Sequence, residues 1–427
     1  MAEQRFVTGS REQAFLLPPD MGEWLPADHL VWLVCEAVDR LDFAAFEREY
    51  RDDGQGRPAY DPRLMVALLL DAYAVGERSS RQIERRCRED VGFRVAACGL
   101  QPDHVTIARF RRRHVVALVG LFAGVLRLCA AAGLLRLGSV AIDGTKVWAD
   151  ANKNRLAPVS AEEAAAQLLR EAEVRDAAED ALPEAEQTAL RGLVPAELAD
   201  PARRAERFAQ AAQLLAEPPV REQAEQRQRQ PAAADAAAPR APRRANKTDP
   251  ESRMMVSPRG WIQGYNAQLA LDESHLVLAC DVSANPSDYR LLQPMITLTE
   301  QALAEAESGQ RPGCYLADAG YWNGKLVEQL SSEGRRLLVK PNGRPRRRGR
   351  SRSPAVAAME RRLAHPANRR RFHRRQALAE PVIAQIKVGK RLDRFRLRGL
   401  AGARLEWTLA CTAHNLRRLH RQQTATS

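Results

Sequence analysis

The spacing of apolar residues changes several times along the chain, and each change predicts a different kind of structure. Over residues 1–135 the apolar residues recur at helical spacing, as in "DPRLMVALLLDAYAVG" (61–76). That stretch has a proline near its start and a glycine at its end, which are typical helix start and stop signals. The pattern turns strand-like over 137–146. We therefore expect an all-helical N-terminal domain over 1–135.

A composition change divides the rest of the chain. Residues 160–245 are rich in Ala, Glu and Arg at first and then in Pro, Ala and Gln. The first part favours helix by propensity, and the second is too poor in bulky apolar residues to fold alone. This segment is predicted to be an insertion with helical character and a disordered exit, which separates 136–159 from 246–427.

Order returns with alternating strand and helix patterns. "GYNAQLALDESHLVLACDVSA" (264–284) predicts a hairpin, and 287–306 predicts an amphipathic helix capped by Asp288. "GCYLADAGYW" (313–322) and 335–340 predict two more strands, followed by C-terminal helices. This order is typical of an α/β fold in which a mixed sheet is flanked by helices. Residues 136–159 and 246–427 are expected to form that domain together.

Charge and cysteine content narrow the function. The chain has 66 Lys and Arg against 53 Asp and Glu, a net charge of +13, which favours nucleic acid as a partner over an anionic membrane. Seven scattered cysteines with no C-x-x-C pair argue against disulfides or zinc and fit a cytoplasmic protein. The apolar run 115–135 contains Arg127, so a buried helix is favoured over a membrane span.

Two basic stretches in the N-terminal region suggest DNA contact. "SSRQIERRCRED" (79–90) and "PDHVTIARFRRRH" (102–114) predict short helices around a glycine-containing turn, a pattern that resembles a helix-turn-helix. A helical scaffold with solvated arginines would give the same pattern. The candidate DNA contacts are Arg81, Arg109, Arg111 and Arg112.

Two predicted strands end on a carboxylate that a glycine follows closely. "VAIDGT" contains Asp143 and "YLADAG" contains Asp318. Functional groups gather at the carboxyl ends of strands in α/β sheets, so neighbouring strands would bring these acids together. Each acid alone is also compatible with a turn cap. Together they would repel unless a cation neutralises them, and oxygen-only ligands point to Mg²⁺ or Mn²⁺.

A third acid lies near the C-terminus, in "ALAEPVIAQIK" (377–387). Glu380 precedes Lys387 by seven residues, which puts both near one face of a helix. Pro381 is expected either to open this helix or to kink a longer one. The pair suits a metal ligand beside a phosphate contact, although an exposed glutamate on a basic helix has the same pattern.

Several motifs occur in an order that resembles the DDE transposases of bacterial insertion sequences. They are "AIDGTK", "TDPESRMM", "GYNAQLALD", "LADAGYW", "AEPVIAQIK", "RFRLRGL" and "EWTLACTAHNLRRL". The resemblance implies an RNase H-like catalytic domain whose triad is Asp143, Asp318 and Glu380, with two Mg²⁺ or Mn²⁺ ions. It further implies cleavage of double-stranded DNA at the element's terminal repeats and strand transfer into target DNA. A homo-oligomer on DNA, in the bacterial cytoplasm at the nucleoid, is expected.

The chain departs from the family pattern at two positions. His373 and Gln376 stand where the family has Tyr and Arg, and Arg374 and Arg375 stand beside them. These two arginines and Lys387 are therefore the expected DNA contacts near the triad. The departure favours one alternative, a catalytically weakened, transposase-derived DNA-binding regulator. An RNase H-like nuclease without strand transfer is a second alternative.

Overall fold

The structure is a computed structural model that describes seven stretches of the chain. These are residues 20–50, 58–152, 156–158, 244–246, 248–257, 260–342 and 353–426. The expected insertion at 160–245 lies outside the described residues except for 244 and 245. Most of the arginine-rich run at 340–354 lies outside them as well.

The N-terminal region is helical, as predicted. Its elements are η1 (Met21–Glu23), α1 (Leu30–Asp39), α2 (Ala44–Glu47), α3 (Pro62–Ala74), α4 (Ser80–Glu89), α5 (Val91–Ala96), α6 (His104–Arg113) and α7 (Val115–Ala131). The helix predicted over 61–76 begins as expected, with Pro62 in its first turn and the Asp61 carboxylate accepting the N–H of Arg63 at 2.7 Å. Gly76 follows it with φ of 82°, a conformation that glycine adopts without strain.

The apolar helix α7 is a core helix of this fold. It buries Leu118, Leu121, Val125 and Cys129 among other side chains, and it packs against α13 (Leu292–Glu305) and α17 (Gly399–Thr426). In the part of the chain that the structure describes, no single helix is long and apolar enough to cross a membrane. By length and composition alone, α6 and α7 would pass as a pair, but the two axes bend by 78° at their junction.

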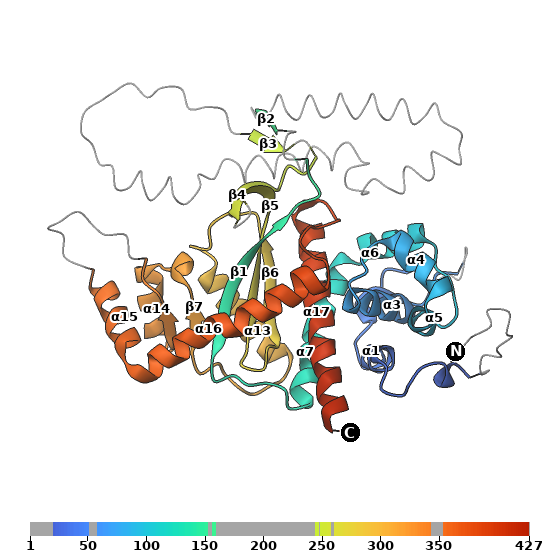
Figure 1. The fold of residues 1–427 in the computed structure, drawn as a ribbon, viewed down its shortest axis with the longest axis horizontal. Helices are drawn as coiled ribbons and strands as arrows, with labels where there is room; N and C mark the ends of the chain where they lie inside the picture. Colours follow the sequence, from blue (N-terminus) through green and yellow to red (C-terminus); the bar gives the residue numbers. More distant parts are fainter. Residues whose placement is uncertain are drawn as a thin grey trace, which may run out of the picture.

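A mixed sheet forms the centre of the molecule (Figure 1). Its strands are β1 (Val140–Trp148), β4 (Arg253–Ser257), β5 (Gly260–Leu271), β6 (Val277–Ser283), β7 (Tyr315–Ala317) and β8 (Leu337–Val339). The order is β4-β5-β1-β7-β8, and β6 also pairs with β5. β1 runs antiparallel to β5 and parallel to β7. The predicted hairpin, β5 and β6, is confirmed, and the mixed sheet has the predicted RNase H-like arrangement.

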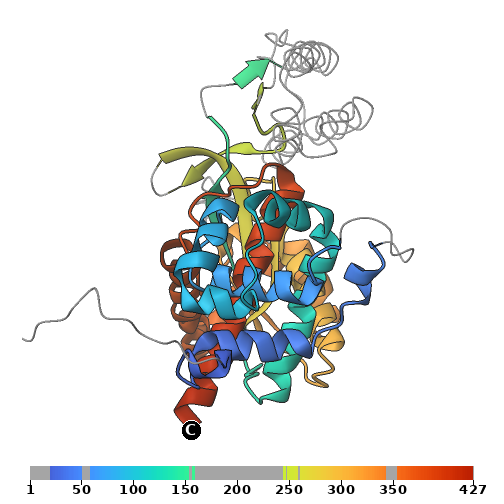
Figure 2. The same ribbon diagram turned by 90° about the vertical axis from the view of Figure 1, so that its right-hand side faces the viewer.

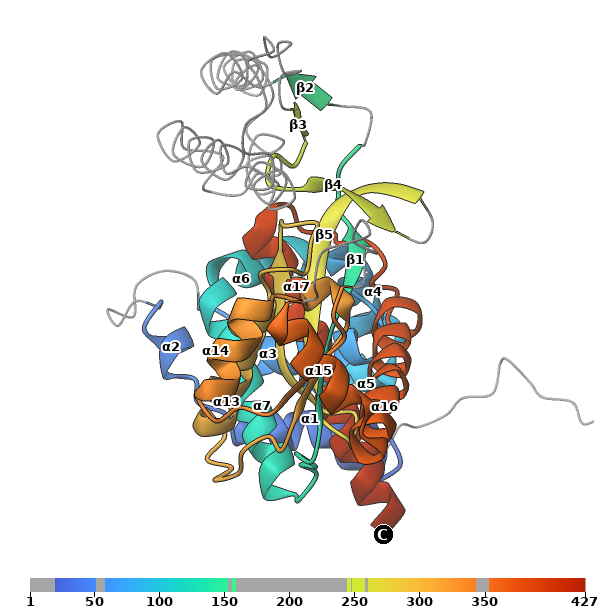
Figure 3. The same cartoon turned by 90° about the vertical axis from the view of Figure 1, so that its left-hand side faces the viewer.

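Helices cover both faces of the sheet. Besides α13 and α17 they are α14 (Gly324–Ser332), α15 (Pro354–Ala364) and α16 (Pro366–Ala384), which continues into the π-helical turn η3 (Gln385–Gly389). α13 and α16 lie on opposite sides of the strands (Figure 3). Two short strands, β2 (Leu156–Pro158) and β3 (Arg244–Asn246), pair with each other where the chain leaves β1 and returns.

The N-terminal helices pack directly on the C-terminal helix α17 (Figures 1 and 2). One continuous apolar core runs from these helices through the sheet. A buried ion pair crosses the contact, with Arg78 Nη1 at 3.3 Å from the Glu406 carboxylate of α17. Arg78 also donates to the carbonyl oxygens of Arg391 and Arg394, and the Glu406 carboxylate accepts the N–H of Arg396 at 2.8 Å. These bonds pair two charges that would be costly to bury alone, although Arg78 Nε and Glu406 Oε1 are buried without a hydrogen-bond partner among the described residues.

The Arg78–Glu406 pair is expected to dominate the stability of this contact. Arg78→Met leaves a buried carboxylate without its cation, which should cost about 3–5 kcal/mol. The control Arg85→Met removes the pair with Glu89, whose side chains are more than half exposed, and should leave the stability nearly unchanged. Urea unfolding followed by circular dichroism measures both variants. Equal losses in the two would show that the buried pair carries no special role.

Candidate active site

Asp143 lies in the middle of β1 and not at its end, which corrects one expectation. The strand passes through Asp143 and Gly144 and continues to Trp148, and it stays paired with β5 throughout. The parallel pairing with β7 stops at Ile142 and Ala317. Asp143 and Asp318 are therefore the next residues on two adjacent strands, and the structure brings them together where β7 ends.

Burial and a neighbouring arginine act in opposite directions on Asp143. Burial raises the pKa of its carboxyl group, and the Arg375 guanidinium, 2.6 Å from Oδ2, lowers it. The backbone N–H of Gly144 donates to Oδ1 at 2.9 Å and also lowers the pKa, whereas the negative charge of Asp318 raises it. The net effect is a raised pKa. Asp143 thus depends on a cation to stay ionised.

Arg375 reaches Asp143 from α16, and the next turns of the same segment also dock on β1. The Lys387 ammonium donates to Thr145 Oγ1 at 3.0 Å and to the Lys146 carbonyl oxygen at 2.8 Å. Both predicted DNA contacts are thus engaged by β1 in this structure. Arg374 points elsewhere and pairs with Glu273 at 3.4 Å, with more than half of its side chain exposed.

Glu380 has different surroundings from the two aspartates. It lies on α16 with its side chain exposed, and Pro381 is inside that helix, so the longer-helix alternative is the one observed. Lys387 belongs to the wider π turn, so the α-helical spacing that predicted a shared face does not apply. Within the described stretches no three His, Cys, Asp or Glu side chains are arranged to hold a metal ion. The carboxylate oxygens suit Mg²⁺ or Mn²⁺, but the set is incomplete in this arrangement.

A second polar group, which the sequence patterns did not predict, lies on the opposite face of β1. Asp288, in the connection between β6 and α13, accepts hydrogen bonds at Oδ1 from Asn266 Nδ2 at 2.7 Å and Gln268 Nε2 at 3.0 Å. The Lys146 ammonium lies 3.5 Å from the same oxygen. The Tyr321 hydroxyl donates to the Gln268 side-chain oxygen.

Asp288 does not cap a helix as predicted. Helix α13 begins at Leu292, and the residue before it, Leu291, makes no side-chain cap. The usable signal was the alternation of polar and apolar residues in "YNAQLAL" (265–271), which places two amides on one face of β5.

Gly144 is explained by this group and not by a turn. A Cβ at position 144 would overlap the Gln268 amide nitrogen and lie 3.0 Å from Asp288 Oδ1. Only a residue without a side chain lets the amide approach β1 so closely. The Asp-Gly pair, a common turn signal, is here part of a continuous strand.

The predicted DNA contacts of the N-terminal region differ in exposure. Arg81 on α4 and Arg109 on α6 are exposed, and Arg112 is partly buried. Arg111 is buried, because its guanidinium donates to the Arg78 carbonyl oxygen at 2.9 Å and to the Ser80 hydroxyl. A DNA contact by Arg111 is therefore incompatible with this packing.

The helix-turn-helix expectation is also wrong in one detail. The short helix α5 lies between α4 and α6, so the two basic helices are not joined by a single turn.

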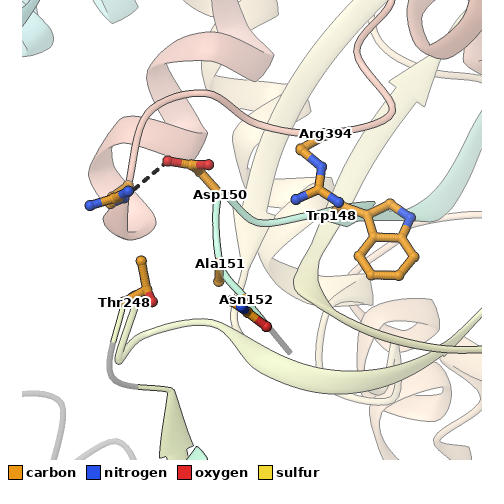
Figure 4. Close-up of a pocket in the computed structure, with 7 residues that line it drawn as sticks. Trp148, Asp150, Ala151, Asn152, Thr248 and Arg394 are labelled. Atoms are coloured by element: carbon orange, nitrogen blue, oxygen red, sulfur yellow. Dashed lines mark hydrogen bonds and ion pairs between the residues drawn. The ribbon is translucent and has the colours of Figure 1, made fainter. Parts of the chain in front are cut away.

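A pocket of about 600 Å³ opens beyond the far end of β1 (Figure 4). The Arg394 guanidinium lies over the Trp148 ring, 5.3 Å from its centroid, and Arg398 pairs with Asp150 at 3.0 Å. Asn152 and Thr248 complete the polar lining. Trp148 is five residues past Asp143, roughly 16 Å along the strand. The pocket is thus separate from the carboxylate pair.

Two family models match the chain in non-overlapping segments. Residues 19–113 match a transposase domain, and residues 238–416 match the transposase DDE domain. The chain belongs to the DDE transposases of insertion sequences. Asp318 and Glu380 of this transposase fall inside the second match, and β1 with Asp143 lies between the two. Searches among curated proteins and among solved structures found no match.

The pairing of Asp143 with Arg375 makes a prediction about pH. Arg375→Ala should raise the pKa of Asp143 further, because burial then acts with no ion partner. A carboxyl group with a raised pKa in the folded state loses stability as pH rises above its ordinary value of about 3.9. The destabilisation caused by Arg375→Ala should therefore be larger at pH 7 than at pH 4, as measured by urea unfolding.

Two controls accompany that measurement. Arg374→Ala removes the more exposed pair with Glu273 and should show little pH dependence. Adding Asp143→Asn to Arg375→Ala should abolish the pH-dependent part of the loss. A destabilisation by Arg375→Ala that is the same at both pH values would contradict the pairing.

Proposed function

We propose that this transposase cleaves DNA at the ends of its element and joins the freed 3′-hydroxyl to target DNA. Asp143 and Asp318 are the acids at the reacting phosphate, and Glu380 is the third member of the set. The observation that supports this most directly is the meeting of Asp143 and Asp318 on adjacent strands. An RNase H-like sheet edge with two paired carboxylates suits phosphodiester chemistry.

Divalent ions are the cofactors that the family implies. Two Mg²⁺ or Mn²⁺ ions would supply charge neutralisation at the phosphate if Glu380 joined the aspartates. The described arrangement does not complete such a site, since Arg375 occupies the cation position at Asp143 and Glu380 is exposed. In this structure the positive charges along β1 come from side chains of the protein itself, namely Arg375, Lys387 and Lys146.

Double-stranded DNA, both terminal repeats and target, is the proposed partner. Arg81 and Arg109 are exposed on the N-terminal helices, and Arg112 is partly so, which suits contact with the phosphate backbone. Arg374 is exposed on α16, next in sequence to Arg375, and suits the same role. A homo-oligomer assembled on DNA in the bacterial cytoplasm is part of the proposal. Arg111 is left out because its guanidinium is buried.

A DNA-binding regulator that no longer cuts is the second candidate function. The exposed position of Glu380 favours it, as do His373 and Gln376 in place of the family's Tyr and Arg. Both candidates require DNA binding, so cleavage and joining distinguish them.

A plasmid excision and integration assay in Mg²⁺ or Mn²⁺ tests the proposal. Asp143→Asn, Asp318→Asn and Glu380→Gln should each reduce cleavage by roughly 100-fold or more, the loss typical of a positioned catalytic group. The control Glu328→Gln changes an exposed acid on α14 and should leave cleavage unchanged. Binding without cleavage by the wild type would indicate the regulator, and cleavage without joining would indicate a nuclease. Full activity of Asp143→Asn would refute the site.

A further inference from the structure

Lys146 and Asp288 form an ion pair beside the catalytic aspartates that has no role in the function proposed above. Their side chains are mostly buried, 15% and 23% exposed, and Nζ lies 3.5 Å from Asp288 Oδ1. Lys146 is three residues past Asp143 on β1, but it points to the opposite face because side chains alternate along a strand. The pair is therefore independent of Arg375 and α16.

The carboxylate of this pair is held rigidly. Oδ1 of Asp288 accepts from the amides of Asn266 and Gln268, and Gln268 is fixed in turn by the buried Tyr321 hydroxyl. Gly144 leaves the space that this network fills. A carboxylate fixed by two amide donors holds its ammonium partner in one place, because neither side chain can reorient freely.

The network adjoins Asp318. A point beside Gly320, where a Cβ would be, is 3.0 Å from Asp318 Oδ1 and 3.3 Å from Asp288 Oδ2. The two carboxylates thus flank one glycine. Burial lowers the pKa of the Lys146 ammonium, and the negative charges of Asp288 and then of Asp318 act in the opposite direction. Because the ammonium contacts Asp288 Oδ1, it lies beside the carboxylate that shares Gly320 with Asp318.

A phosphate that approaches Asp143 and Asp318 needs a positive group to offset their negative charge. Arg375 is paired with Asp143 at 2.6 Å, and Lys387 donates to two oxygens of β1. Lys146 has three N–H donors, and its contact with Asp288 is long. It can keep that contact and still donate to a phosphate oxygen.

We propose that Lys146 binds a DNA phosphate where Asp143 and Asp318 meet, and that Asp288 is the positioning residue that holds Lys146 there. This inference rests on the proposed function for the identity of the substrate. The competing explanation is an ion pair that only stabilises the sheet. The two differ in whether Lys146 contributes to the salt dependence of DNA binding and whether Asp288 affects the rate of cleavage.

DNA binding of the intact transposase to a terminal-repeat duplex is measured at several salt concentrations. Lys146→Met should reduce the slope of log affinity against log salt by about 1, the value for one lost phosphate contact. Lys146→Arg keeps the charge and should retain the slope. The control Lys325→Met removes an exposed lysine of α14 and should leave the slope unchanged.

Asp288→Asn tests the positioning role. The lysine charge remains, so the slope should stay near that of the wild type, while the cleavage rate at saturating DNA should fall roughly 10- to 100-fold because the ammonium is misplaced. Melting temperatures verify that each variant is folded, and Lys146→Gln replaces Lys146→Met if the latter unfolds. A lowered melting temperature with normal slope and normal cleavage would show the purely structural role and overturn the inference.

The result also separates this inference from the proposed function. If the wild type cleaves and Lys146→Met has an unchanged slope, the inference fails and the function stands. If the wild type does not cleave, the function fails. The slope of Lys146→Met then decides the inference alone, with a loss of about 1 supporting the phosphate contact.

Discussion

The buried carboxylate of Asp143 is the constraint on which the arrangement of the catalytic domain depends. A negative charge with little access to water requires a cation, and Arg375 of α16 supplies it at 2.6 Å. Lys387, twelve residues later, binds the same strand through Thr145 and the Lys146 carbonyl oxygen. α16 and the π turn η3 that follows it are therefore held on β1 by an ion pair and by the Lys387 hydrogen bonds, in addition to the apolar side chains Leu378 and Val382 that α16 buries. The ionised state of Asp143 and the position of this helix therefore depend on each other.

Each face of β1 carries one mostly buried ion pair. Asp143 faces α16 and is paired with Arg375, whereas Lys146 faces the connection between β6 and α13 and is paired with Asp288. The strand alternation separates the two pairs, so that one can change partner without disturbing the other. In the proposed function DNA would compete for cations that the carboxylates already engage, and the longer contact, that of Lys146 at 3.5 Å, would be the easier to share.

Local patterns were sufficient to predict the sheet, its hairpin and the meeting of Asp143 with Asp318, because each depends on short apolar runs. They misplaced the end of β1, which continues past Asp143 to Trp148. The features that local patterns failed to predict depend on contacts between distant segments. The local pattern at Gly144 is compatible with a turn, because it does not show that Gln268 packs against this glycine. Arg111 was predicted to lie on the surface, because the sequence does not show its hydrogen bonds to Ser80 and to the Arg78 carbonyl oxygen. Asp288 was predicted to cap a helix, because its partners Asn266 and Gln268 are more than a dozen residues earlier and a local pattern does not include them.

The segment 391–396 connects the N-terminal helices to the strand that carries Asp143. On one side, Arg78 donates to the carbonyl oxygens of Arg391 and Arg394 and pairs with Glu406. On the other side, the segment forms two backbone hydrogen bonds with Trp148. The Trp148 N–H donates to the Asp393 carbonyl oxygen at 3.0 Å, and the Phe395 N–H donates to the Trp148 carbonyl oxygen at 2.8 Å.

The helices proposed to bind DNA cannot move relative to the sheet without breaking these buried bonds, because each would leave a charge or a backbone group unpaired. If the N-terminal helices bind DNA as proposed, its orientation is consequently fixed with respect to β1. The same contacts form one wall of the pocket at Trp148 and Arg394, so DNA that spans both regions would pass this junction on its way to Asp143.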